Sequence, residues 1–457
     1  MKSLSIFGTS SDAGKSTLSF ALTYLLHQKG FKVAPFKAQN VSNNSHVCDE
    51  GGEIAIPQFF AAEAIGLKTS PLMNPVLLKS GKANHASLII NGYAQDEKSV
   101  KEYYADLDQL KPVVKKAYET LSKKFDLIVA EGAGSPVELN LMDKDLSNIY
   151  IATEFNTKII LVADIEKGGV FASIWGVYNL LPKALKKNVI GVIINKFRGD
   201  SSLFDEGRRI IETEFGLKVL GLIPYRAFNL GFEDAQSLIN YTQDKPDAKI
   251  KIAVIKLPHM SNFTDFEPLI NDEEVLVDFI DTPSFLDKYD VVIIPGSKRT
   301  IHDLRWLKTR GFEKTLKAYK GKILGICGGY EMLFNELYDE HGVEEEKETR
   351  EKGLGFIDET LLFNKEKTLC KGTYHLFGLK VKGYEIHHGE ANSIAYHHEN
   401  IYGTFLHGVF ENDNFRKFLF EDYKGYNFSQ FKKDKIDAYC SFINENLDLD
   451  TIIKEIS

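Results

Sequence analysis

Hydrophobic and polar positions form two kinds of block along most of the chain. Short uninterrupted apolar runs alternate with longer stretches, such as Lys15–Lys29, in which apolar residues recur at helical spacing. Continuous apolar runs are typical of parallel strands buried on both faces. In the first half the predicted strands are Leu4–Phe7, Lys32–Pro35, Leu127–Glu131, Ile159–Asp164, Ile190–Asn195 and Val219–Pro224. The alternation predicts an α/β fold in which helices cover both faces of a parallel sheet.

A break in this pattern divides the chain. Between Asn240 and Ile250 the residues are mostly polar and include one proline, as in a linker. We therefore predict two domains, residues 1–245 and residues 250–457. The charged run His341–Lys352 predicts a solvated loop or helix face, and helical spacing near the C-terminus predicts packing helices of the second domain. The second series of predicted strands is Ile252–Ile255, Val275–Ile280, Val291–Pro295 and Lys322–Ile326.

The composition limits the class of protein. A chain of 457 residues is long enough for two or three domains, and 43% hydrophobic with 26% charged residues is ordinary for globular proteins. The net charge of -8 argues against a broad nucleic-acid-binding face but allows a local basic pocket for phosphates. No apolar stretch approaches the ~20 residues that span a bilayer. We expect a soluble protein that binds neither nucleic acid nor membrane.

The four cysteines, Cys48, Cys327, Cys370 and Cys440, are widely dispersed and form no C-x-x-C pair. This spacing predicts neither a disulfide framework nor a zinc site, and it fits a reducing cytoplasm. The first apolar run is too short for a signal peptide, so we interpret it as a buried strand.

A small-residue loop, Gly8–Ser16, joins the first predicted strand to the first long helix. Backbone N–H groups of such a loop surround phosphate oxygens, Lys15 would reach the β- and γ-phosphates, and the Ser16 hydroxyl would bind Mg²⁺. Five residues separate Gly8 from Gly14, one more than in the common pattern. The alternative is a glycine-rich turn without ligand. The predicted ATP-binding residues of this loop are Gly8, Thr9, Asp12, Ala13, Gly14, Lys15, Ser16 and Thr17.

The stretched loop resembles that of dethiobiotin synthetase and its relatives, which phosphorylate a carboxylate or carbamate. Glu131 and Lys37 follow predicted strands, at the strand ends where such folds bind ligands. Glu131 would hold Mg²⁺ together with Ser16, Lys37 would neutralise an acyl phosphate, and Asn195 would contact adenine. Solvated loop charges are the alternative for Glu131 and Lys37. Gln39 and Asn40, just past Lys37, are predicted to act with it on the substrate.

Cys327 stands between a predicted strand and a helix, with Gly328 and Gly329 directly after it. Glycines permit the sharp turn that presents a nucleophile at a sheet edge, and a helix N-terminus would favour the thiolate. The alternative is an inert core cysteine. The flanking glycines favour a catalytic nucleophile, because they suit a simple core strand poorly.

A nucleophilic thiol needs a base, and His407 in Tyr402–Gly408 is the best candidate, with His387 and His388 as competitors. The N–H groups of Gly328 and of the loop around Gly296 would form an oxyanion hole. This arrangement resembles a class I glutamine amidotransferase, which implies thioester formation and release of ammonia from L-glutamine. Many such domains carry a glutamate two residues after the histidine, where this chain has valine. Glu411, four residues on, would orient His407, or the site would act as a dyad.

The order of the motifs resembles the cobyric acid synthase family over nearly the whole chain. The resemblance implies an enzyme that uses ATP, Mg²⁺ and glutamine to amidate the b, d, e and g carboxylates of a corrinoid, adenosylcobyrinic acid a,c-diamide. Local departures occur at Pro57–Phe60 and Phe228–Leu238. The motifs that carry the resemblance are Gly8–Ser16, Phe36–Asn40, Gly51–Ile54, Met73–Lys79, Glu131–Pro136, Ser261–Phe266, Pro295–Lys298, Gly325–Gly329, Gly383–His387 and Leu406–Gly408.

Two other functions compete with this one. Cobyrinic acid a,c-diamide synthase has the same domain order, but the Phe36–Asn40 motif favours the first family. A nucleotide switch related to partitioning ATPases, with a degenerate second domain, is disfavoured because Cys327 and His407 are both present.

Overall fold

The computed structural model describes residues 2–80, 85–95, 98–99, 103, 107–228, 230–231, 245–345 and 347–457. The chain divides into two compact units. Unit 1 comprises Met1–Ser42, Cys48–Phe232 and Lys433–Ser457, and unit 2 comprises Asn43–Val47 and Glu233–Lys432. The sequence placed residues 433–457 in the second domain, whereas in the structure they pack with unit 1. Most of the unusual segment 228–238 and the linker residues up to 244 lie outside the described residues.

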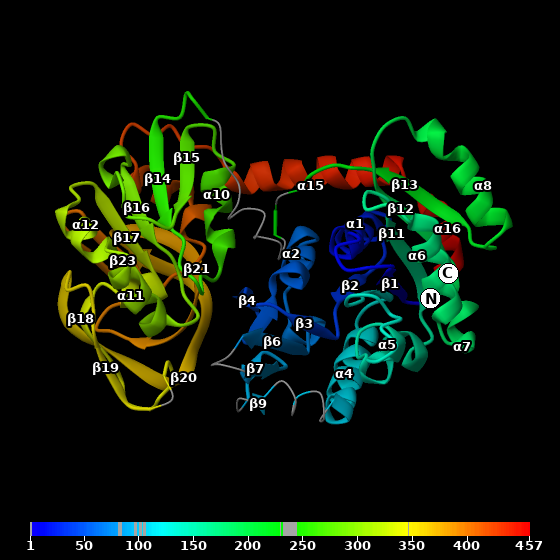
Figure 1. Ribbon diagram of the computed structural model, residues 1–457, viewed down its shortest axis with the longest axis horizontal. Helices are drawn as coiled ribbons and strands as arrows, with labels where there is room; N and C mark the ends of the chain where they lie inside the picture. The colour runs from blue at the N-terminus through cyan, green and yellow to red at the C-terminus, as the bar shows by residue number, and fades with distance from the viewer. Residues whose placement is uncertain are drawn as a thin grey trace. The chain divides into compact units, whose positions relative to one another are not determined.

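Unit 1 is built on a parallel sheet of six strands in the order β13-β12-β11-β1-β10-β2, flanked by helices (Figure 1). Each strand overlaps one of the six apolar runs predicted from the sequence, so this half of the α/β prediction is confirmed. The strands are β1 Leu4–Gly8, β2 Val33–Phe36, β10 Leu127–Glu131, β11 Lys158–Asp164, β12 Val189–Phe197 and β13 Val219–Pro224.

Helices of unit 1 bury the apolar sheet residues. Helix α4 (Leu107–Ser122) covers β2 and β10, and α6 (Val170–Leu180) covers β11 and β12. Helix α1 (Lys15–Gln28) packs on β1, β2 and β10. The remaining helices and strands of this unit are α2 Ile56–Ala64, α5 Ile149–Glu154, α7 Lys183–Lys186, α8 Asp205–Thr213, β3 Gln39–Val41, β5 Glu53–Ala55, β6 Val76–Ser80, β7 His85–Ile90, β8 Tyr93–Ala94 and β9 Lys98–Ser99.

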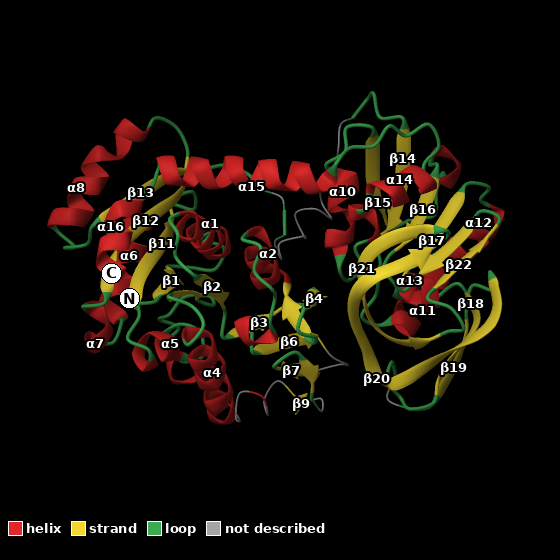
Figure 2. Cartoon of the chain, turned by 180° about the vertical axis from the view of Figure 1, so that it is seen from behind, coloured by secondary structure: helices red, strands yellow, loops and turns green. Residues whose placement is uncertain are grey.

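The two ends of the chain meet in unit 1. The Lys2 N–H donates to the Ile456 carbonyl across 2.7 Å, and the labelled termini lie side by side in both ribbon views (Figures 1 and 2). The last helix, α16 (Leu449–Ile456), packs against β13. The C-terminal helices are therefore part of the first unit's core.

Unit 2 is built on a second sheet in the order β15-β14-β16-β17-β23-β22 (Figure 2). All neighbouring strands are parallel except the edge strand β22, which runs antiparallel to β23. The four runs predicted from the sequence are β14, β15, β16 and β17, which confirms the α/β prediction for this half. The strands are β14 Ile250–Ile255, β15 Val275–Ile280, β16 Val291–Ile294, β17 Lys322–Ile326, β22 Ala395–His398 and β23 Ile401–Thr404.

A further sheet of unit 2, β19-β18-β20-β21, contains a correction to the sequence analysis. The end of the charged run, Thr349–Lys352, is strand β19 and pairs antiparallel with β18, instead of forming a loop or helix face. Its alternating half-buried and exposed positions allow charged side chains to face solvent from a strand. The elements not yet given are β4 Ser45–Val47, β18 Phe334–Asp339, β20 Ile357–Leu376, β21 Leu379–Glu390, α10 Glu267–Ile270, α11 Thr300–Thr309, α12 Phe312–Ala318, α13 Gly328–Glu331, α14 Asp413–Leu419 and α15 Phe428–Glu445.

Among the described residues, none of the helices combines the length and the apolar character that crossing a bilayer requires.

Candidate active site

The loop between β1 and α1 has the backbone of an anion-binding turn. Asp12 and Gly14 both adopt positive φ, 57° and 94°, and Gly14 lies in the left-handed region just before the first helical residue. Lys15 folds back over the loop, where its Nζ donates to the Ser10 carbonyl across 3.1 Å. A Cβ at Gly8 would lie only 2.7 Å from the Ser10 backbone carbonyl oxygen, so glycine is required there. Successive N–H groups in such a turn make an anion-binding concavity.

Glu131, at the end of β10, gathers three polar side chains in unit 1. Its Oε1 accepts from Ser16 Oγ at 2.7 Å and from Lys37 Nζ at 2.8 Å, and its Oε2 accepts from Gln58 Nε2 at 3.1 Å. Glu131 is 3% exposed, so this cluster is shielded from water. The structure therefore brings together Ser16, Lys37 and Glu131, which the sequence predicted for one site, and adds Gln58.

The charges at this end of the sheet suit a polyphosphate. Burial lowers the pKa of Lys15, Glu131 acts in the opposite direction, and Lys37 lowers it further. Two lysines thus lie around one carboxylate, and an anionic ligand would restore the charge balance. The Ser16 hydroxyl and the Glu131 carboxylate are hard oxygen donors, the kind that Mg²⁺ prefers, so the donor set fits this ion.

Other predicted residues of unit 1 contact the loop or the neighbouring strand. Asn195 Nδ2 donates to the Ala13 carbonyl at 2.9 Å, and Thr17 Oγ1 donates to the Gly14 carbonyl at 2.8 Å. Asn195 therefore supports the loop Gly8–Ser16, called the phosphate loop below. Its contact with adenine stays a prediction. In β3, Asn40 Oδ1 accepts from the next backbone N–H.

Cys327 occupies a strained turn at the end of β17. Its φ of 50° and ψ of -113° are unusual for a residue with a side chain, and its N–H donates to the Thr404 carbonyl at 2.8 Å. Strain of this kind persists where the surrounding structure holds it, and it is common at nucleophiles. The thiol is 6% exposed, with the Ile386 carbonyl 3.8 Å from Sγ. The predicted strand, sharp turn and helix are all present.

His407 is held by a buried carboxylate. Its Nδ1 lies 2.6 Å from Asp265 Oδ2, and Asp265 Oδ1 accepts the Gly408 N–H at 2.8 Å. Asp265 lies in the short 3-10 helix Phe263–Phe266. His407 Nε2 is buried and forms no hydrogen bond with a nitrogen or oxygen atom of the described residues.

The charges around His407 favour its protonated form. Burial lowers the pKa of His407, but Asp265 and then Cys327 more than offset this effect and raise it to about 10. An imidazolium paired with a thiolate is the reactive form of a cysteine nucleophile. The pair can therefore attack an amide and protonate the amine that leaves.

The two predicted sources of an oxyanion hole lie against each other and against His407. A Cβ at Gly328 would come within 2.8 Å of Ser297 N, and a Cβ at Gly296 would come within 3.1 Å of His407 Cε1. Gly328 is the first residue of α13, so its N–H has no partner within the helix. Backbone donors are thus available next to Cys327.

The competing residues have other roles. His387 is buried with both ring nitrogens engaged, Nδ1 at 2.8 Å from the Gly389 carbonyl and Nε2 at 3.1 Å from Glu385 Oε2. His388 Nδ1 lies 3.0 Å from the Asn364 carbonyl. Asp265 occupies the orienting position that the sequence analysis considered for Glu411.

A segment from early in the chain packs around this site. Asn43–Val47 belongs to unit 2, where the His46 ring lies 3.7 Å from the Tyr384 ring, and Tyr384 stacks on His407 at 5.3 Å. Burial holds the pKa of His46 well below its ordinary value, so this ring is neutral. The sequence analysis did not assign His46 or Tyr384 to the site.

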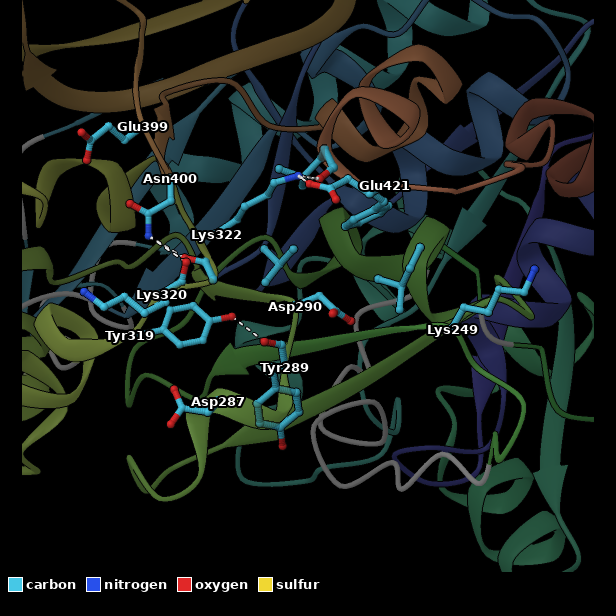
Figure 3. Close-up of a pocket in the computed structure, with 15 residues that line it drawn as sticks. Lys249, Asp287, Tyr289, Asp290, Tyr319, Lys320, Lys322, Glu399, Asn400 and Glu421 are labelled. Carbon is cyan, nitrogen blue, oxygen red and sulfur yellow. Dashed lines mark hydrogen bonds and ion pairs between the residues drawn. The ribbon is translucent and has the colours of Figure 1, made fainter.

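A pocket of about 620 Å³ lies at the opposite ends of the same strands (Figure 3). Lys322, which lines it, is the first residue of β17, whereas Cys327 follows the last. Lys322 pairs with Glu421 at 3.2 Å, and Tyr319 donates to the Tyr289 carbonyl at 2.6 Å. The carboxyl ends of parallel strands are the usual ligand side, so this pocket is separate from the reactive thiol.

Two functional residues escaped the sequence analysis. Asp265 lies within the quoted motif Ser261–Phe266, but nothing in its spacing ties it to His407, 142 residues away. Gln58 lies in the departure Pro57–Phe60, where an amide between a proline and two aromatic residues gives no chemical signal. In both cases the fold, and not a local pattern, creates the contact.

Two domain families match this chain. A CobQ/CobB/MinD/ParA nucleotide binding domain matches residues 4–230, and a CobB/CobQ-like glutamine amidotransferase domain matches residues 251–415. The first match contains the phosphate loop and Glu131, and the second contains Asp265, Cys327 and His407. The two matches correspond to the two sites described above.

Similar proteins match over the whole length. A cobyric acid synthase of Acinetobacter baylyi is 54% identical and covers 100% of this chain and 99% of that protein. Cobyric acid synthases of Clostridium perfringens and Chlorobium phaeobacteroides are 37% and 40% identical, over 98% and 91% of this chain and 98% and 90% of theirs. The chain therefore belongs to the cobyric acid synthase family, and it is a glutamine-dependent amidotransferase with a nucleotide-binding domain.

Proposed function

We propose that this enzyme amidates the b, d, e and g carboxylates of adenosylcobyrinic acid a,c-diamide, which gives adenosylcobyric acid. The observation that carries the proposal is the similarity to cobyric acid synthases over the whole chain, together with a phosphate loop and a Cys–His–Asp arrangement in its two units. The proposed activities are ATP-dependent amide synthesis in unit 1, which includes residues 433–457, and glutamine hydrolysis in unit 2. The dispersed free cysteines fit a reaction in the reducing cytoplasm.

In the glutaminase step, the Cys327 thiolate attacks the side-chain amide carbon of glutamine. The N–H groups of Gly328 and Gly296 stabilise the negative charge on the amide oxygen. His407, protonated and oriented by Asp265, gives its proton to the leaving nitrogen, so ammonia departs and a thioester remains. Water then attacks the thioester with His407 as base, which releases glutamate and restores the thiolate.

In the synthase step, the substrate carboxylate attacks the γ-phosphorus of ATP. The products are ADP and an acyl phosphate, which ammonia converts to the amide with release of phosphate. Lys15 and the N–H groups of the loop hold the β- and γ-phosphates, and Lys37 offsets the charge on the acyl phosphate. Gln39 and Asn40 contact the substrate, and Asn195 contributes to the adenine side of the nucleotide site.

Ser16 and Glu131 are the proposed Mg²⁺ ligands. The ion, when bound, offsets the charge of the β- and γ-phosphates during transfer. The Ser16 hydroxyl donates to Glu131 Oε1, and the Lys37 ammonium pairs with the same carboxylate oxygen. These contacts already orient the Glu131 carboxylate beside the phosphate loop.

One assay tests this function. The enzyme is incubated with ATP, Mg²⁺, glutamine and adenosylcobyrinic acid a,c-diamide, and the amides added per corrinoid are counted by mass spectrometry. We expect four amides and coupled formation of ADP and glutamate. A parallel incubation replaces the diamide with cobyrinic acid. Two amides added to cobyrinic acid, and none to the diamide, would instead identify a cobyrinic acid a,c-diamide synthase. ATP hydrolysis without any amidation would identify a nucleotide switch.

A further inference from the structure

Two histidines and an aspartate form a cluster in unit 2 that the proposed reaction does not use. His259 lies in the loop that follows β14, and His302 and Asp303 lie in the first turn of α11. One ligand atom from each residue lies within 4.8 Å of the other two. The sequence analysis did not find this cluster, because His259 is far from the other two residues along the chain.

Nδ1 of each histidine approaches the same carboxylate oxygen of Asp303. His259 Nδ1 lies 2.7 Å and His302 Nδ1 3.4 Å from Asp303 Oδ1. Donor atoms of a tetrahedral site with metal–nitrogen bonds of about 2.0–2.1 Å are about 3.3 Å apart. The second distance already fits this value, and the first requires an opening of a fraction of an ångström.

The carboxylate is oriented for this role by its second oxygen. Asp303 Oδ2 accepts from Ser297 Oγ at 2.7 Å and from the His259 N–H at 3.1 Å. These bonds fix the carboxylate plane and direct Oδ1 toward the two imidazoles. Outer hydrogen bonds of this kind are the usual support of metal ligands.

The three side chains differ in their exposure to solvent, and this difference suits a bound ion. The Asp303 side chain is completely buried, whereas those of His259 and His302 are 31% and 45% exposed. The two rings meet edge to face, with centroids 4.7 Å apart. An ion would therefore have a buried carboxylate behind it, two imidazoles beside it and access to water in front.

We propose that His259, His302 and Asp303 form a binding site for a divalent transition-metal ion, with Zn²⁺ as the reference occupant. Imidazole nitrogens favour Zn²⁺, Co²⁺, Ni²⁺ and Cu²⁺, whereas Mg²⁺ and Ca²⁺ prefer oxygen ligands. A metal binds imidazole through a nitrogen that carries no proton, so any proton on these ligand atoms is released to solvent on binding. Water would complete the coordination.

This site is distinct from the Mg²⁺ ligands proposed for the phosphate loop, which are all oxygen atoms in unit 1. It is also distinct from Cys327 and His407, although Ser297 is shared with the loop around Gly296. The proposal does not depend on the corrinoid reaction, because metal binding is measured without substrate.

The test is metal binding by the full chain after treatment with a chelator, in a Cys327→Ala background that removes the reactive thiolate as a competing ligand. Zn²⁺ is titrated against a chromophoric chelator, and Co²⁺ is titrated with detection of its visible absorption bands. We expect one Zn²⁺ per chain at this site and a Co²⁺ spectrum without thiolate charge-transfer bands. Loss of a residue that only hydrogen-bonds a metal ligand typically weakens metal binding by about 10–100-fold. Replacement of a ligand itself, in His259→Ala or His302→Ala, should weaken Zn²⁺ binding by at least this much.

His398→Ala is the matched control, because His398 is an exposed histidine of the same unit outside the cluster. Circular dichroism of the metal-free proteins verifies that each variant is folded. If His259→Ala and His302→Ala bind Zn²⁺ as tightly as His398→Ala, the ion is bound elsewhere and the proposal is wrong.

Discussion

Nδ1 of His407 lies 2.6 Å from Oδ2 of Asp265, although the two residues are 142 positions apart in the chain. The contact fixes the orientation of the ring, because Nδ1 is directed to the carboxylate and Nε2 faces away from it. Asp265 is thus a positioning residue for His407, in place of the glutamate that many related domains carry two residues after the histidine.

Asp265→Asn should lower kcat for glutamine hydrolysis by up to about 10⁴, the loss seen when the orienting aspartate of a Ser-His-Asp triad is neutralised. The pKa of His407, raised to about 10, should fall toward its ordinary value, because the amide carries no charge. The imidazolium form of His407 is present below its pKa and is lost as the pH rises through it. The alkaline limb of the pH profile should therefore move to lower pH in this variant.

Glu411→Gln is the control for Asp265, since Glu411 was the alternative orienting residue. It should leave both the rate and the alkaline limb nearly unchanged. Equal losses in the two variants would contradict the role assigned to Asp265.

Cys327→Ala should abolish glutamine hydrolysis, because it removes the thiol that attacks the glutamine amide. Amidation should survive when ammonium salts replace glutamine, and it should increase with pH as more free ammonia is present. The measurement is amide formation by mass spectrometry with each nitrogen source. A variant that is inactive with ammonium but binds ATP normally would show that Cys327 is needed beyond the release of ammonia.

Glu131→Gln should abolish Mg²⁺-dependent ATP use while glutamine hydrolysis persists, because the change leaves unit 2 intact. It should also lower the free energy of unfolding by about 3 kcal/mol, since the Lys37 ammonium stays buried without its anion. Denaturant unfolding of the full chain measures this effect. The double variant Glu131→Gln, Lys37→Met removes this buried ammonium and should recover part of the stability without restoring ATP use.

Gly328→Ala should lower the rate of glutamine hydrolysis by up to about 10²–10³, the cost of losing an oxyanion donor, because the added Cβ displaces the N–H of residue 328 from the oxyanion position. The added Cβ would lie 2.8 Å from Ser297 N and would displace the loop beside Cys327. Gly372→Ala is the matched control, because its Cβ would meet nothing closer than a Tyr374 ring atom at 3.8 Å. Comparable losses in both variants would point to a general effect of alanine on unit 2.

The strands were accessible from sequence because each is an apolar run that needs no information about its neighbours. The turns at Gly14 and Cys327 were equally accessible, since glycine beside a reactive residue marks a strand-to-helix turn. The prediction of the α/β fold and the resemblance to the family are both confirmed. These features are local in the chain.

The misjudged and missed features depend on contacts that are distant in the chain. Asp265, in the 3-10 helix Phe263–Phe266, and Gln58, in α2, gain their contacts only when elements distant in the chain converge. Thr349–Lys352 is highly charged, yet it forms a strand because β18 supplies backbone partners. Residues 433–457 were assigned by their order in the chain, whereas packing against β13 decides where the last helix belongs.

The meeting of Lys2 and Ile456 in unit 1 makes the glutaminase unit an insertion within the nucleotide-binding unit. A single cut between the halves would leave the first fragment without the helix that covers β13. A separable synthase would instead need residue 232 spliced to residue 433. Because the termini are already adjacent, a short linker would close them into a ring, and the chain could be reopened elsewhere as a circular permutant.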